Sequence, residues 1–90
     1  MIRAKVNPAL KVRVRDCFLE GGVVGWAYKF NGLIEIDPRQ TEKEYLMTLC
    51  HEWLHHAIPS AGERNIARLE KSIGELLWRK GYRRNKITRP

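Results

Sequence analysis

The chain has 90 residues, of which 43% are hydrophobic and 30% charged, with 17 Lys and Arg against 10 Asp and Glu. This length fits one domain with a small core, and the composition argues against disorder. No apolar run approaches the roughly 20 residues that span a bilayer, and the start of the chain lacks the apolar stretch of a secretory signal. We therefore expect a cytoplasmic protein without a membrane role. Two cysteines, Cys17 and Cys50, are too few for a disulfide framework.

The net charge of +7 is unevenly distributed. Residues 79–90 contain six basic and no acidic residues. Within a single domain that covers residues 1–90, we expect residues 83–90 to form a basic, frayed tail. Such a tail can contact nucleic acid without sequence specificity, and it equally fits a plain solvated end.

The first part of the chain predicts three strands. Residues 10–15 alternate apolar and basic side chains, residues 23–30 are rich in β-branched and aromatic residues, and residues 33–37 resume this pattern. Glu20-Gly21-Gly22 predicts a turn, and Asn31-Gly32 is a preferred pair for a two-residue hairpin turn. We expect a three-stranded antiparallel meander.

Two helices are predicted after the strands. Thr41-Glu42-Lys43-Glu44 is a capping box for a helix that is apolar around most of its circumference and ends before Pro59. Ser60-Ala61-Gly62-Glu63 is a second capping box, and apolar residues at helical spacing continue to about Lys80. Strands followed by helices in one core indicate the α+β class. The tryptophans are expected to pack in this core: Trp26, Trp53 and Trp78.

The first helix contains His51-Glu52-Trp53-Leu54-His55, which matches the pattern His-Glu-x-x-His. Residues four apart lie on one face of a helix, so His51 and His55 can bind one metal ion. Glu52 lies about 100° around the helix, beside the ion, where it can act as a general base. The competing interpretation is a pair of hydrogen-bonded core histidines. Burying these groups without a metal would leave polar atoms unsatisfied, so the pattern favours a Zn²⁺ site.

A catalytic zinc has three protein ligands and one open position. His56, the remaining histidine, points to another face, where we expect a surface residue or a neighbour of the ligands. The third ligand is therefore expected to be a carboxylate. Glu63, at the start of the second helix, is the first choice, and Glu70, two turns later, is the second. The competing role of Glu63 is to cap its own helix.

The residues of this site resemble a known family. His51-Glu52-x-x-His55, followed by residues 63–69, is similar to the gluzincin-type small metallopeptidases, in which a Glu on the next helix is the third zinc ligand. The resemblance covers residues 33–82 and includes small phage and prophage proteins of this kind. It implies a minimal zincin-like domain in which residues 33–37 pair with an extended peptide. The SprT-like proteases, also similar in their basic surface, use a third histidine that this chain lacks.

These observations predict a zinc-dependent hydrolase of peptide bonds that acts on a peptide or protein, with Glu52 as the general base. The alternative is a basic binding or regulatory module stabilised by zinc, without protease activity. Its partner would be nucleic acid or an acidic protein, contacted by Arg13, Arg15 and the tail. A third interpretation is a degenerate protein that keeps the scaffold without the metal.

Overall fold

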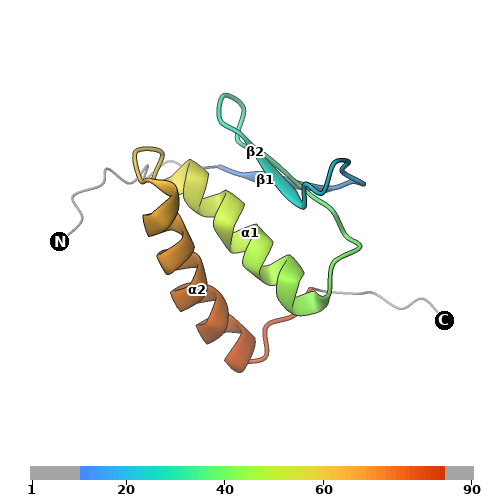
Figure 1. Cartoon of the computed structure of the whole chain (residues 1–90), viewed down its shortest axis with the longest axis vertical. Helices are drawn as coiled ribbons and strands as arrows, with labels where there is room; N and C mark the ends of the chain where they lie inside the picture. Colours follow the sequence, from blue (N-terminus) through green and yellow to red (C-terminus); the bar gives the residue numbers. More distant parts are fainter. Residues whose placement is uncertain (1–10, 85–90) are drawn as a thin grey trace.

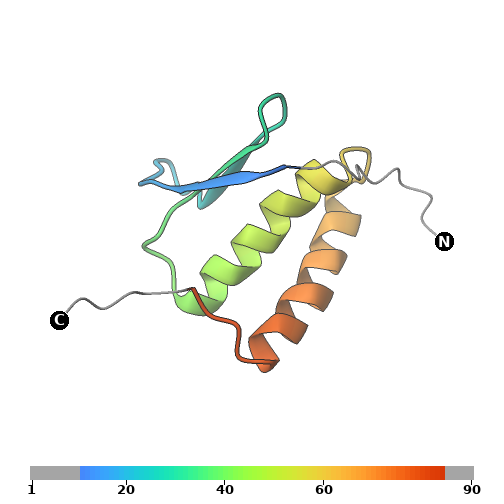
Figure 2. The same cartoon turned by 180° about the vertical axis from the view of Figure 1, so that it is seen from behind.

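The computed structural model describes residues 11–84, which form one sheet and two helices (Figure 1). In chain order the elements are β1 (Arg13–Asp16), β2 (Gly25–Tyr28), β3 (Leu33–Ile36), α1 (Glu42–Ala57) and α2 (Glu63–Arg79). Seen from both sides, α1 lies between the sheet and α2 (Figure 2). The predicted α+β class is confirmed. None of the helices in residues 11–84 is long and apolar enough to cross a membrane.

The sheet is mixed, so the predicted antiparallel meander is wrong. Its strand order is β1-β3-β2, with β3 parallel to β1 and antiparallel to β2. The reason lies in burial. Ile34 and Ile36 of β3 are fully buried, whereas β1 is exposed along its whole length. The most apolar strand therefore takes the central position, and the chain reaches it only after it has formed both edges.

The turns on either side of β2 depend on glycine. Gly21 and Gly22, between β1 and β2, have φ values of 68° and 76°. The hairpin between β2 and β3 is confirmed, but its turn spans Lys29–Gly32 and only Gly32, with φ of 66°, adopts a positive value. The side chain of Asn31 instead accepts a hydrogen bond of 3.1 Å from the backbone N–H of Leu33. The expected two-residue turn is thus replaced by a longer one.

Helix α1 begins at the predicted capping box. The N–H of Glu44 donates to the Thr41 hydroxyl at 3.2 Å, and the N–H of Thr41 donates to the Glu44 carboxylate at 3.0 Å. Tyr45, one turn into the helix, packs against Ile34 and Ile36 in the core. The cap and this contact together place α1 beneath the sheet, with its middle turns close to β2.

The tryptophans do not form the core that the sequence predicts. Trp26 is 53% exposed and Trp53 is 44% exposed. Trp26 lies on the face of the sheet away from α1, because it alternates with Gly25, which faces that helix. Trp53 lines a groove between α1 and α2. Trp78 is half-buried, and the guanidinium of Arg83 lies 3.3 Å from the centre of its ring. Residues 85–90 of the predicted basic tail lie outside the described residues.

Candidate metal centre

His51 and His55 lie one turn apart on the same face of α1, as the four-residue spacing requires. Their Nε2 atoms are 3.1 Å apart, and the two ring planes are inclined by 69°. Both side chains are partly accessible, at 24% and 21% exposure. Two imidazole nitrogens therefore converge on one point at the protein surface.

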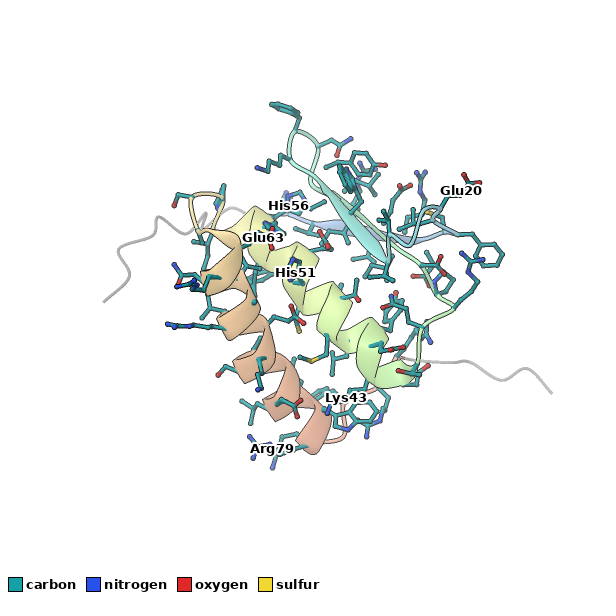
Figure 3. The ribbon with its side chains drawn as sticks, viewed as in Figure 1. Glu20, Lys43, His51, His56, Glu63 and Arg79 are labelled. Carbon is teal, nitrogen blue, oxygen red and sulfur yellow. The ribbon has the colours of Figure 1, made fainter. Side chains whose placement is uncertain are left out.

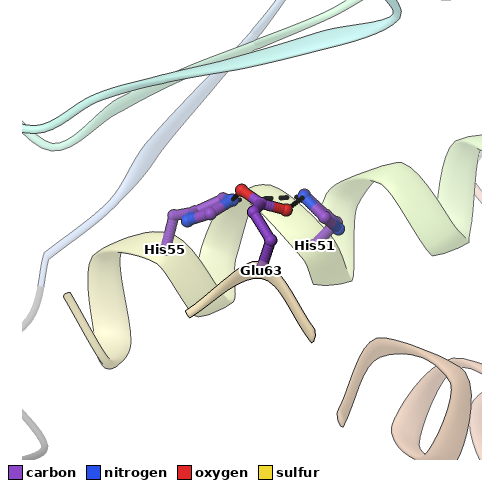
Figure 4. A group of neighbouring side chains, drawn as sticks. All are labelled: His51, His55 and Glu63. Carbon is purple, nitrogen blue, oxygen red and sulfur yellow. Dashed lines mark hydrogen bonds and ion pairs between the residues drawn. The ribbon is translucent and has the colours of Figure 1, made fainter. Parts of the chain in front are cut away.

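Glu63, the first residue of α2, completes this group (Figure 4). Its Oε1 atom lies 2.9 Å from Nε2 of His55, and its Oε2 atom lies 3.4 Å from Nε2 of His51. The three candidate ligand atoms all lie within 4.8 Å of one another. The loop between the helices thus brings together the three residues that the sequence predicts as ligands. The labelled side chains of His51 and Glu63 lie close together over α1 (Figure 3).

The predicted second capping box is wrong, which removes the competing role of Glu63. Gly62 is the N-cap of α2, and no side chain caps this helix. The helix starts two residues later than Ser60 would require, so the Ser60 hydroxyl lies before the first turn. Glu63 therefore occupies the first helical position rather than the third, and its carboxylate extends toward α1.

Glu70, the second candidate for the third ligand, contacts a different atom. Its Oε1 lies 2.7 Å from Nδ1 of His51, on the opposite side of the ring from Glu63. A carboxylate accepts hydrogen bonds, so this contact requires an N–H at Nδ1, and the neutral ring then has its lone pair on Nε2. Glu70 therefore contacts the Nδ1 side of His51 alone, whereas Glu63 contacts Nε2 of both His51 and His55.

Glu52 faces a cavity of about 230 Å³ between the start of β2 and α1. His51 and Glu70 line the same cavity. Burial raises the pKa of Glu52, and the carboxylates of Glu63 and Glu70 raise it further, while His51 lowers it. Glu52 is thus a half-buried carboxylate with increased proton affinity, and it shares this cavity with His51.

Gly25 of β2 lies directly against this cavity, and the sequence analysis did not single it out. A Cβ atom on Gly25 would lie 2.5 Å from Cγ2 of Thr48 and 3.0 Å from Cγ of Glu52. A glycine is therefore required for β2 to approach α1 so closely. A glycine inside a segment of apolar and β-branched residues is the sequence signal that could have predicted this close approach.

Burial lowers the pKa of His55, and the charges of His51 and Lys29 lower it further, while Glu63 raises it. The neutral imidazole, which is the form that binds metals, is therefore favoured at this position.

His56 is separate from the group. It is buried, and its Nε2 lies 3.3 Å from the carbonyl oxygen of Leu33, so it joins α1 to β3. The expected surface position of His56 is wrong.

Comparisons with family models, with curated proteins and with solved structures found no match to this chain.

Proposed function

We propose that this protein is a zinc-dependent hydrolase of peptide bonds, with His51, His55 and Glu63 as metal ligands. The convergence of these three side chains carries the proposal. Atoms bound tetrahedrally to zinc at roughly 2.0–2.1 Å are about 3.3 Å apart. The contacts of 2.9, 3.1 and 3.4 Å within the group match this spacing. Two imidazoles and one carboxylate are also the donor set of many catalytic zinc sites.

Zinc bound by these residues would lower the pKa of a coordinated water toward neutrality and polarise a carbonyl group. Glu52 is the residue that takes the proton, because its carboxylate lines the cavity beside His51. Its raised pKa improves its match to a base that works near neutral pH. Glu70 holds the ring of His51 so that Nε2 faces the other two ligands.

The strand expected to pair with substrate needs correction. Residues 33–37 include β3, whose two edges are already paired with β1 and β2, so an extended peptide cannot add to it. β2 has an unpaired edge among the described strands, and its first residue, Gly25, lies against Glu52. We place the peptide along β2, where main-chain hydrogen bonds would hold the scissile bond beside the cavity.

Both described cysteines, Cys17 and Cys50, are free thiols, which supports a cytoplasmic location.

Elemental analysis of the purified protein tests the metal site. We expect about one zinc per chain in the wild type and a loss of zinc in His55→Ala. His56→Gln is a matched control, because it changes a neighbouring histidine that contacts Leu33 instead of the group. Wild-type protein that stays metal-free after incubation with zinc would refute the proposal.

Cleavage of a mixed peptide library tests the reaction. Glu52→Gln should retain zinc and reduce cleavage by at least about 100-fold, as expected for loss of a general base. Glu75→Gln, which removes a carboxylate on α2 that pairs with Lys43, should cleave like the wild type. Zinc binding with equal cleavage by wild type and Glu52→Gln would exclude the assigned mechanism. Zinc binding without cleavage by either would favour the binding-module alternative.

A further inference from the structure

The sheet has an open face, which we call the outer sheet face. It is the side turned away from α1, and neither helix covers it (Figures 1 and 2). The strand register places one row across the sheet at Arg15, Glu35 and Trp26, and a second row at Arg13, Leu33 and Tyr28. Ile34 and Ile36 alternate with these residues and point into the core. The face therefore combines aromatic side chains on β2 with basic side chains on β1.

The aromatic side chains of this face are accessible and well oriented. Trp26 is 53% exposed and Tyr28 is 39% exposed. Their ring centres are 6.5 Å apart with an edge-to-face inclination of 63°. The Tyr28 hydroxyl donates a hydrogen bond of 2.7 Å to Glu35, which restricts rotation of the ring. Tyr28 can therefore offer its ring to a ligand with little further loss of side-chain freedom, and Trp26 is exposed beside it.

The charge of the outer sheet face is positive. Glu35 is its acidic member, and it is buried at 6% exposure beneath Arg15 and Tyr28. Arg15 itself is 64% exposed and can donate to further acceptors. Arg13 is exposed and forms no ion pair within residues 11–84. An anion approaching this face meets two guanidinium groups and no uncovered carboxylate.

We propose that the outer sheet face binds single-stranded nucleic acid. Unpaired bases stack on accessible aromatic rings, and arginines bind the phosphates between them. Strands are about 4.8 Å apart, so the arginines of β1 lie about 10 Å across the sheet from the aromatic residues of β2. Residues at alternate positions along each strand are about 7 Å apart, which gives two successive stacking positions and two phosphate contacts. The stacked bases of a duplex cannot use the rings in this way.

Fluorescence anisotropy with a labelled oligothymidylate of about 15 nucleotides tests this inference. We expect the full-length wild type to bind it and Trp26→Ala to weaken binding about tenfold. Trp26→Phe should retain most of the affinity, because it keeps an aromatic ring. Arg13→Ala should weaken binding and reduce the slope of log K against log salt by about one. The matched control is Trp53→Ala, which removes an exposed tryptophan that lines the groove between α1 and α2 instead of the sheet.

Three results would overturn the proposal. The first is the absence of oligonucleotide binding by the wild type at about 50 mM salt. The second is equal or tighter binding of a duplex of the same length, which would indicate general attraction to phosphate. The third is loss of binding on replacing Lys86 and Arg89 by alanine while Trp26→Ala binds normally, which would assign binding to the basic tail. The metal content of these variants should stay at the wild-type level, so this test is independent of the proposed hydrolase.

Discussion

The carboxylate of Glu70 lies 2.7 Å from Nδ1 of His51, while Glu63 approaches Nε2 of the same ring. Two acidic residues of α2, two turns apart, therefore contact opposite nitrogens of one histidine. This arrangement gives them different roles. Glu63 can share an ion with His51 and His55, whereas Glu70 can fix the protonation and orientation of the ring.

Glu70→Ala should weaken zinc binding about 10- to 100-fold while the fold is retained, because His51 loses the acceptor that orients it. Competition with a chromogenic zinc chelator measures the affinity. Glu63→Ala removes a proposed ligand and should weaken binding more than Glu70→Ala does. The reverse order would exchange the roles of the two carboxylates.

The contact between Gly25 and α1 predicts a specific pair of variants. Gly25→Ala should lower the free energy of unfolding by about 1–3 kcal/mol, because its Cβ would overlap with Cγ2 of Thr48. Adding Thr48→Ser removes that methyl group and keeps the hydroxyl, which bonds to Gln40 at 2.8 Å. The double variant should recover much of the lost stability in urea denaturation. If Gly25→Ala alone is as stable as the wild type, β2 does not need this close approach.

The local features of the fold were predictable from the sequence, and the long-range ones were not. The capping box at Thr41 and the spacing of His51 and His55 depend on residues within one helical turn, so they can be read from adjacent positions. The strand order depends on which strand is paired at both edges. Alternation in residues 10–15 indicates a strand but does not indicate which strand pairs with it.

The same distinction applies to the candidate site. Glu63 follows the histidines closely enough in sequence for the loop to bring it back to α1. The helical spacing predicts Glu70 on the same side of α2 as Glu63, but its contact with Nδ1 of His51 instead of Nε2 depends on the packing of the two helices. Gly25 is 27 residues before Glu52, and only the structure places them together.

Acid should destabilise the protein through Asp37, which follows β3. The side chain of Arg39, the backbone N–H of Leu19 and the backbone N–H of Arg39 all donate to its carboxylate. The Arg39 side chain first, and then Leu19, holds the pKa of Asp37 well below its ordinary value. Because the pKa of Asp37 is lower in the folded than in the unfolded state, the stabilisation is complete above the pKa of an unfolded Asp, about 3.9. It is lost as the pH falls from there toward the pKa of the folded state.

Urea denaturation between about pH 3 and 7 measures this effect. The wild type should lose stability steeply at the acidic end, and Asp37→Asn should be less stable at neutral pH with a flatter dependence. Glu20→Gln, which changes an exposed carboxylate in the nearby turn, should follow the wild-type curve. An Asp37→Asn profile parallel to the wild type would show that other carboxylates cause the acid sensitivity.

Arg84 should contribute more to stability than the adjacent Arg83. Its guanidinium donates to Glu42 at 2.5 and 3.1 Å and to the carbonyl oxygen of Pro38 at 3.1 Å, and it lies 4.1 Å from the centre of the Tyr45 ring. The side chain is only 16% exposed, so these bonds join the segment after α2 to the start of α1 with little competition from water.

Arg84→Ala should therefore lower the free energy of unfolding by about 2 kcal/mol, because hydrogen bonds to a charged group are lost and Glu42 loses a cation. Arg83→Ala removes the same charge, but the contact that it removes, with Trp78, is exposed. It should lower the free energy of unfolding by less than about 1 kcal/mol. Thermal and urea denaturation of the two variants side by side give the comparison. Equal effects would mean that net charge, and not the contacts of Arg84, determines the contribution of this segment to stability.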